Sequence, residues 1–141
     1  MDTATPPSFS LPVRVYWEDT DAGGVVYNAN YLKFFERARS EWLRSLDVHQ
    51  QALRDETGGV FVVSEIAIKY HRPARLDDLL TITVCLQQMG KASMVFTQQA
   101  RRGGVEGELM AEATVRVGWV DAEKMRPVKM PADVLQRLAA G

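Results

Sequence analysis

The stretch Trp17-Glu18-Asp19-Thr20-Asp21-Ala22-Gly23-Gly24-Val25-Val26-Tyr27-Asn28-Ala29-Asn30 joins two segments whose hydrophobic periods differ. Residues 13–18, which lead into this stretch, alternate apolar and polar side chains. This alternation is the period of a strand and predicts the first one here. Residues 19–24 contain two aspartates and a glycine pair, a composition typical of a loop. From about residue 30 apolar side chains recur at three- and four-residue steps, as in an amphipathic helix. The stretch therefore predicts a carboxylate-bearing loop beside a helix N-terminus.

The expected helix carries a bulky apolar stripe, which predicts that it packs deep against a sheet. Asn28 or Asn30 is expected to cap its start, and it should end near residues 47–49. Charged side chains such as Arg37 and Arg39 fall mostly off the stripe. A short helical piece is expected over residues 50–57, before Gly58 and Gly59. The stripe consists of Tyr31, Phe34, Phe35, Ala38, Trp42 and Leu46.

Four further strands are expected over residues 60–70, 79–89, 92–101 and 109–121, and a short helix over 132–138. Their short links favour antiparallel neighbours. We therefore predict an α+β fold in which a curved antiparallel five-stranded sheet wraps around one long central helix. Residues 1–10 are expected to form a flexible arm, and residues 11–141 one domain. Long edge strands would allow pairing with a second copy of the chain.

Composition narrows the class of protein. The 141 residues are 46% hydrophobic, and 17 basic against 18 acidic residues give a net charge of −1. Nothing in this balance favours nucleic acid or an anionic membrane as partner. The single cysteine, Cys85, fits a reducing compartment. The first ten residues lack the features of a signal peptide, and no apolar run reaches the ~18 residues of a membrane span. We expect a cytoplasmic protein without stable membrane insertion.

The loop at residues 19–24 permits more than one reading. Its Asp-x-Asp spacing has some likeness to a calcium loop, but Gly23 and Asn30 stand where side-chain ligands are required, so calcium is disfavoured. An aspartate-rich turn held by local hydrogen bonds is one reading that remains. The other is a catalytic carboxylate. Free N–H groups at a helix start polarise a carbonyl, and a nearby carboxylate can attack that carbonyl or activate water for the attack.

Other catalytic systems and cofactor motifs are missing from the sequence. His49 and His71 lie outside any motif, and Cys85 lies within an expected strand without an activating partner. There is no Gly-x-Ser-x-Gly elbow, phosphate loop, dinucleotide fingerprint or metal-ligand cluster, so neither cofactor nor metal is expected. A basic group near one strand end is either a solvated edge or a contact for the phosphates of a thioester cofactor. It comprises Lys69, His71, Arg72 and Arg75.

Several segments together resemble a known family. Residues 13–31 running into Phe35-Glu36-Arg37-Ala38-Arg39, and residues 70–78, 95–98 and 124–127, are similar to the hotdog-fold acyl-CoA thioesterases. The branch is that of 4-hydroxybenzoyl-CoA thioesterase and, more closely, the YbgC-type enzymes encoded with the Tol–Pal envelope system. The resemblance implies a hotdog fold and hydrolysis of a thioester of CoA or of acyl carrier protein. It also implies homodimers, often paired into tetramers, with active sites between protomers.

The same resemblance implies the site residues. Asp21 matches the family's catalytic carboxylate, as general base or as nucleophile, and the backbone N–H at Asn28 matches the group that holds the thioester oxygen. The relatives usually carry His at position 28 and often Tyr at position 17, where this chain has Asn28 and Trp17. The loop and pocket residues would be Gly23, Gly24, Val26, Tyr27 and Tyr31.

Two alternatives stand beside hydrolysis. The replacement at Asn28, together with the envelope link of the relatives, motivates the first: a non-catalytic dimer that binds or scaffolds acyl-CoA or acylated carrier protein. A hotdog dehydratase is disfavoured, because such enzymes place a His in the site and neither histidine is expected near the loop.

Overall fold

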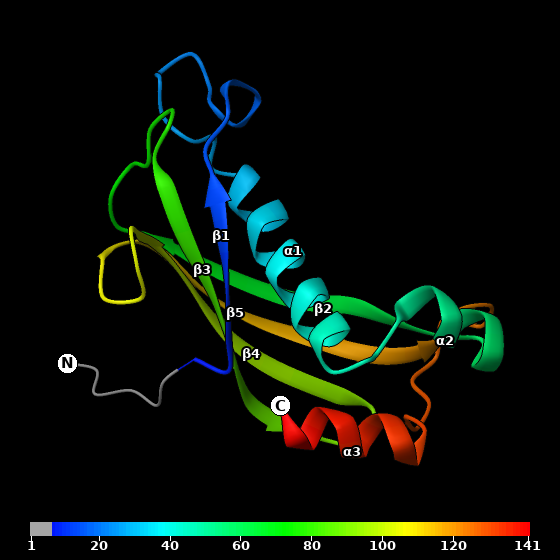
Figure 1. Ribbon diagram of the computed structural model, residues 1–141. Coiled ribbons are helices and arrows are strands. Elements are labelled where there is room, and N and C mark those ends of the chain that lie inside the picture. The colour runs from blue at the N-terminus through cyan, green and yellow to red at the C-terminus, as the bar shows by residue number, and fades with distance from the viewer. Residues whose placement is uncertain (1–6) are drawn as a thin grey trace.

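A computed structural model describes residues 7–141. Its sheet has the strand order β1-β3-β4-β5-β2 with antiparallel neighbours throughout, which confirms the predicted α+β class and the five-stranded sheet. Figure 1 shows α1 lying across one face of this sheet, with α2 and α3 near its far end. The strands are β1 (Phe9–Arg14), β2 (Gly59–Tyr70), β3 (Leu79–Met89), β4 (Ser93–Arg102) and β5 (Glu108–Asp121). The helices are α1 (Asn30–Ser45), α2 (Gln50–Thr57) and α3 (Ala132–Ala140).

The aromatic stripe of α1 faces the sheet, as its period predicts. Phe34 and Phe35 are fully buried, and the ring of Trp42 meets that of Phe96 on β4 edge to face, with centroids 5.4 Å apart. Each such side chain contributes about 1.5–3 kcal/mol when buried. This packing fixes the first turn of the 16-residue helix relative to the sheet.

Arg39 departs from the expected polar face of α1. Only 8% of its surface is exposed, and its Nη1 donates a hydrogen bond to Gln98 Oε1 on β4 at 2.9 Å. The periodic pattern misplaced it because a buried arginine is uncommon without a partner. Here the buried amide of Gln98 supplies that partner from a strand remote in sequence.

The first strand lies earlier than its alternation predicts. β1 ends at Arg14, and residues Trp17–Asp19 form a short 3-10 turn, η1, with Trp17 80% exposed. Pro12 is tolerated inside β1 because the strand lies at the sheet edge, where one side needs no donor. The arm expected over residues 1–10 is wrong at its C-terminal end, since Phe9 and Ser10 pair with β3. Residues 1–6 lie outside the described part of the chain.

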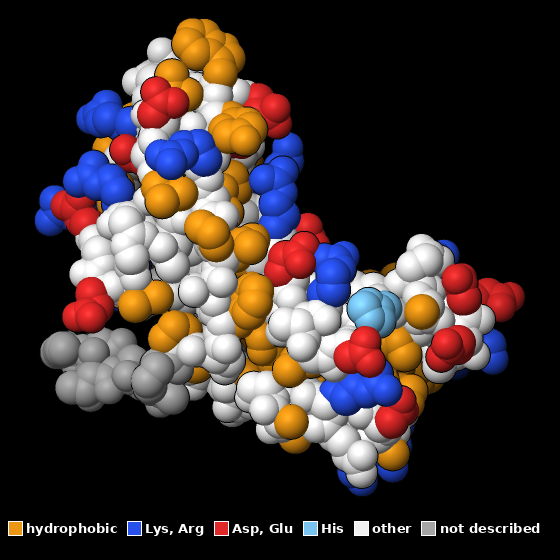
Figure 2. Space-filling view, in the orientation of Figure 1, with side chains coloured by type: hydrophobic (Ala, Val, Ile, Leu, Met, Phe, Trp, Pro, Cys, Tyr) orange, Lys and Arg blue, Asp and Glu red, His pale blue; other side chains and the backbone are white. Residues whose placement is uncertain are grey.

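The remaining elements agree with the predicted ranges to within about two residues. α2 ends at Gly58, whose φ of 76° places it in the left-handed region that glycine adopts without strain. On the face drawn in Figure 2, acidic and basic side chains are interspersed, as the net charge of −1 suggests. Among residues 7–141 no helix combines the length and apolar character of a membrane span.

Candidate active site

The loop between η1 and α1 is a small, tightly hydrogen-bonded hairpin. Thr20 bridges to Val26, Asp21 N–H donates to Val25 O at 2.9 Å, and Gly24 N–H donates to Asp21 O at 2.9 Å. Gly24 has a φ of 78°, which explains why a glycine is needed at this turn. The hairpin is also tied to the segment after β2, because Val26 N–H donates to Ala74 O at 2.8 Å.

Asp19 anchors this hairpin to the helix. It is 6% exposed; its Oδ2 accepts the Tyr16 N–H at 2.8 Å, and its Oδ1 accepts the Asn30 Nδ2 at 2.7 Å. The expectation that Asn28 or Asn30 caps α1 is therefore wrong. The N-cap residue is Ala29, without a side-chain cap bond, and the amide of Asn30 is engaged with Asp19 instead.

Asp21 has a different environment from that of Asp19. Its side chain is exposed, and its Oδ1 accepts the Gly23 N–H at 2.8 Å. A Cβ at position 23 would lie 3.1 Å from this oxygen, so glycine permits the close approach. Within residues 7–141, Oδ2 has no hydrogen-bond partner. The loop is thus an aspartate turn that still leaves one carboxylate oxygen available for chemistry.

The backbone at Asn28 has one bonded and one unbonded polar group. Its carbonyl accepts the Tyr70 hydroxyl at 2.9 Å, which ties the start of α1 to the end of β2. Tyr31 reinforces this link, because its ring lies edge to face on Tyr70 with centroids 5.6 Å apart. In the described part of the chain the Asn28 N–H has no hydrogen-bond partner. A free N–H just before a helix start carries partial positive charge and attracts a ligand oxygen.

Asp21 and Asn28 line one open pocket of about 400 Å³. Val26 and Tyr31 also line it, so the structure brings together four of the residues expected at the site. The other three, Gly23, Gly24 and Tyr27, lie in the same loop but are not part of the pocket wall. The wall also contains residues that were not assigned to the site: Val25, Tyr70, His71, Arg72 and Pro73.

The far wall of the pocket comes from the end of β2. His71 lies there with Asp21, so the expectation that neither histidine is near the loop is wrong. The two are far apart in sequence; the pairing of β2 in the sheet and the bond from Val26 N–H to Ala74 O bring them together. His71 Nε2 bonds Glu112 Oε2 at 2.7 Å, and Arg72 pairs with Glu108 at 3.0 Å. Of the four residues of the basic group, His71 and Arg72 reach the pocket wall.

The two tyrosines of the pocket are neutral hydrogen-bonding groups at physiological pH. Burial raises the pKa of Tyr31 above its usual value, and a hydrogen bond with the Ala74 backbone acts in the opposite direction. Desolvation also raises the pKa of Tyr70. Three or more His, Cys, Asp or Glu side chains do not gather anywhere in residues 7–141 in a way that would hold a metal ion.

Comparison with known proteins places this geometry in a family. Residues 15–138 match the family model described as the thioesterase-like superfamily. The chain belongs to this superfamily. It is 49% identical over 126 residues to acyl-CoA thioesterase YbgC of Haemophilus influenzae, covering 89% of this chain and 90% of the relative. Identity is also 49% to acyl-CoA thioester hydrolase YbgC of Escherichia coli O6:H1, covering 90% and 92%.

A solved structure supports the same placement. The structure of the probable thioesterase of Bartonella henselae superposes on this chain with a TM-score of 0.80. The two sequences are 34% identical, and the match covers 86% of this chain and 98% of that one. These relatives confirm both the resemblance to YbgC-type thioesterases and the hotdog fold. Although His71 lies in the pocket, the family membership does not favour a dehydratase.

Proposed function

We propose that this protein hydrolyses acyl-CoA thioesters to the free acid and CoA in the pocket between the 20–28 loop and the end of β2. The observation that carries the proposal is the convergence of the Asp21 carboxylate and the free Asn28 N–H on one pocket. The 49% identity to the YbgC thioesterases supports the same reaction class.

In this mechanism the thioester carbonyl oxygen accepts a hydrogen bond from the Asn28 N–H. That bond and the helix start stabilise the negative charge that develops on the oxygen during attack. Asp21 takes a proton from the attacking water and returns it to the leaving sulfur of CoA. Alternatively, its carboxylate attacks the carbonyl carbon, expels the thiolate and forms a mixed anhydride that water then cleaves. Both routes require the free oxygen of Asp21.

The remaining residues of the loop and of the pocket wall hold the reacting groups in place. Gly23 and Gly24 shape the turn that presents Asp21, while Val26 and Tyr31 line the pocket. Tyr27 supports the hairpin, since its N–H donates to Asp19 O at 2.9 Å. His71 and Arg72 line the pocket wall, and we propose that they contact the phosphates of CoA. Acyl carrier protein is the alternative carrier of the acyl group.

A panel of short, long and aromatic acyl-CoAs, together with an acylated carrier protein, tests the reaction. We expect release of free thiol from at least one acyl-CoA class, measured with a thiol reagent against a blank for the protein's own half-buried Cys85. Tight binding of acyl-CoA without release of thiol across the panel would contradict hydrolysis.

That contrary result would favour the second candidate, a non-catalytic dimer that binds or scaffolds acyl groups in connection with the cell envelope. One observation supports it. The side chain at position 28 is an amide, which cannot transfer a proton as the His implied by the family resemblance could. Hydrolysis that depends only on the backbone N–H of Asn28 does not need that side chain.

The protein is further proposed to form homodimers through β2, with sites between protomers. β2 spans 12 residues at the sheet edge and ends at the pocket residue Tyr70; among residues 7–141 it pairs with β5 alone. Such a long free edge can pair with a second copy. Light scattering should give at least twice the chain mass of 15.8 kDa. Pairing of two dimers would give a tetramer and four times that mass. A monomeric mass at micromolar concentration would contradict the proposal. The single cysteine fits action in the reducing cytoplasm.

A further inference from the structure

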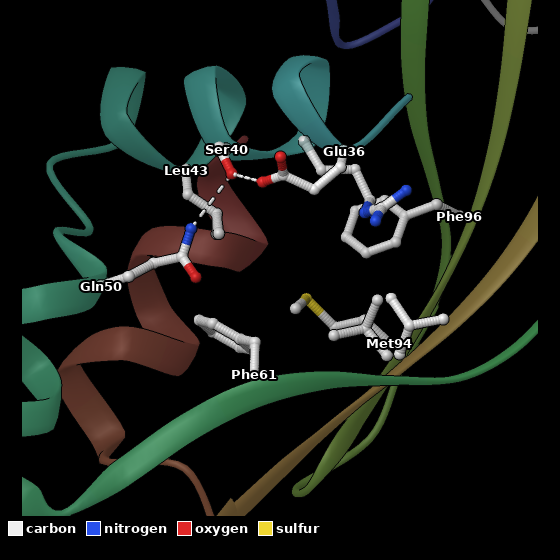
Figure 3. A pocket seen from close by; sticks show the side chains of 10 residues that line it. Glu36, Ser40, Leu43, Gln50, Phe61, Met94 and Phe96 are labelled. Carbon is white, nitrogen blue, oxygen red and sulfur yellow. Dashed lines mark hydrogen bonds between the residues drawn. The ribbon is translucent and has the colours of Figure 1, made fainter. Parts of the chain in front are cut away.

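A second pocket, of about 120 Å³, lies between α1 and the first half of β2 (Figure 3). Phe61, Met94 and Phe96 form much of its apolar wall, and Arg39, Glu36 and Ser40 supply polar groups from α1. An engineered cavity of about 150 Å³ accommodates benzene, so this pocket has room for the last few heavy atoms of a chain.

Arg39 is held in a fixed position within this pocket by a hydrogen bond to a buried amide. Its Nη1 donates to Gln98 Oε1 at 2.9 Å, and Gln98, which is 1% exposed, is itself fixed by bonds from its Nε2 to Phe35 O at 3.0 Å and Thr83 O at 3.2 Å. A guanidinium has five N–H donors and no acceptor. Among residues 7–141 the Arg39 side chain makes no other hydrogen bond and no ion pair. The pocket therefore contains free donors of a nine-tenths-buried cation.

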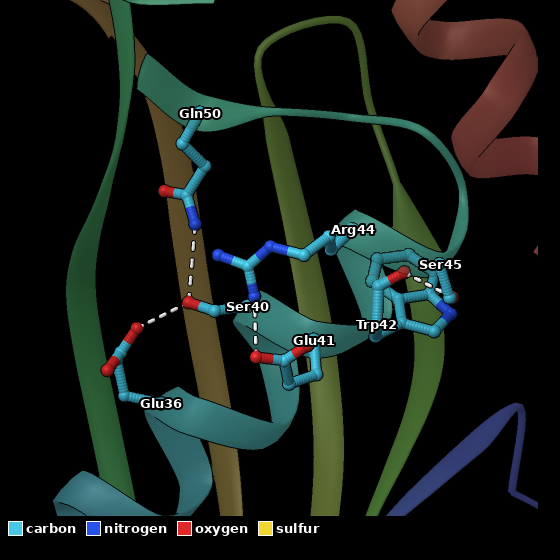
Figure 4. A network of polar contacts seen from close by, with 7 residues as sticks. All are labelled: Glu36, Ser40, Glu41, Trp42, Arg44, Ser45 and Gln50. Atoms are coloured by element: carbon cyan, nitrogen blue, oxygen red, sulfur yellow. Dashed lines mark hydrogen bonds and ion pairs between the residues drawn. The ribbon is translucent and has the colours of Figure 1, made fainter. Parts of the chain in front are cut away.

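The neighbouring carboxylate does not neutralise this cation by direct contact. Glu36 accepts a hydrogen bond from the Ser40 hydroxyl, which in turn accepts one from Gln50 Nε2 at 3.2 Å (Figure 4). Burial lowers the pKa of Arg39, and the nearby negative charge of Glu36 acts in the opposite direction. A ligand that brings its own acceptor oxygens would satisfy the free donors of Arg39 better than Glu36 does.

The Arg39 pocket and the catalytic pocket lie along the same pair of elements. At one end Tyr31 of α1 contacts Tyr70 of β2, and at the other α1 and Phe61 of β2 enclose the Arg39 pocket. Eleven residues separate Asn28 from Arg39, which is ~16 Å along a helix. Long helical side chains lean toward the N-terminus, so the guanidinium lies closer, roughly 10 Å from the thioester position. Both elements carry apolar side chains between the residues that line the two pockets: Leu32 of α1 is 40% exposed, and Ile66 and Ile68 of β2 are partly buried against the core.

We propose that the Arg39 pocket receives the far end of the acyl group and selects acyl groups that end in a carboxylate. The inference rests on the proposed thioesterase function of the neighbouring site. An arginine fork matches the two oxygens of a carboxylate. An extended chain advances ~1.2 Å per bond, so acyl groups of about eight to ten carbons span the distance between the two pockets.

Pairs of acyl-CoAs with equal chain length, ending in a carboxylate or in a methyl group, test this specificity. The wild-type protein should show the higher kcat/KM for the carboxylate-ended member at about eight to ten carbons. Arg39→Met should lower the ratio of the two kcat/KM values about 10- to 100-fold, as expected for loss of a charge-assisted bond. Glu36→Gln removes the competing carboxylate and should raise the same ratio.

Controls separate recognition from structural damage and from failure of hydrolysis. Arg37→Met removes an exposed arginine from the same helix and should leave the ratio unchanged. Affinities of both acyl-CoAs, measured by calorimetry with Asp21→Asn protein, test the pocket without turnover. Absence of hydrolysis by wild type would contradict the proposed function alone. A preference for methyl-ended chains at every length, in rates and affinities, or a ratio insensitive to Arg39→Met and Glu36→Gln, would overturn the Arg39 proposal.

Discussion

Replacing Asp21 with Asn is expected to lower kcat for acyl-CoA hydrolysis by about 10²–10⁴-fold, the usual contribution of a positioned general base. The amide oxygen introduced at position 21 can still accept the Gly23 N–H, which Asp21 Oδ1 accepts at 2.8 Å, so the turn itself should persist. What is lost is the free anionic oxygen. Initial rates of thiol release, measured for wild type and variant at equal protein concentration, give the ratio.

A matched variant separates this loss from a general effect of charge. Glu18→Gln removes an exposed carboxylate three residues away that does not line the pocket of Asp21 and Asn28. Its rates should stay within about twofold of wild type, and its melting temperature should be unchanged. If Asp21→Asn folds normally and retains rates within a few-fold of wild type, Asp21 is neither base nor nucleophile. Asp21→Ala should then be equally harmless, because no chemistry would depend on that side chain.

The periodic parts of the fold could be predicted because local period and burial agree. The apolar stripe of α1 and the alternation in β5 each repeat over ten or more residues. The apolar face of each element is buried, as expected. Alternation failed at Val15 and Trp17. Val15 is fully buried outside any strand, whereas Trp17 is exposed in η1. A run of only three repeats is too short to distinguish a strand from a turn that happens to bury one side chain.

The site was predictable only where it is local in sequence. Asp21 and Asn28 lie seven residues apart, so a motif could place them together. His71 reaches the same pocket through the pairing of β2 with β5, and Arg39 is buried through a bond to Gln98 that spans 59 residues. No hydrophobic period encodes such pairs. A polar residue type at an otherwise buried strand position, as at Gln98, is the one signal that could have suggested a partner.

Asp19→Asn is expected to lower the free energy of unfolding by about 3 kcal/mol, because a bond to a charged acceptor is lost and a buried donor is left unsatisfied. Each carboxylate oxygen of Asp19 accepts one N–H, from Tyr16 and from Asn30 Nδ2. The amide introduced at position 19 has only one oxygen, so its NH₂ must face one of these donors. The melting temperature should fall by roughly 10 °C.

Exchanging the donor and the acceptor of the hydrogen bond between residues 19 and 30 tests whether the loss of stability comes from this contact. In the double variant Asp19→Asn/Asn30→Asp, the new amide at position 19 can accept from the Tyr16 N–H and donate to the new carboxylate at position 30. A negative charge in the first turn of α1 is also favourable. Urea unfolding should therefore show the double variant to be more stable than Asp19→Asn alone, while the exposed Asp21→Asn loses no more than about 0.5 kcal/mol. Equal losses for Asp19→Asn and Asp21→Asn, or no recovery in the double variant, would mean that Asp19 does not anchor the 20–28 loop.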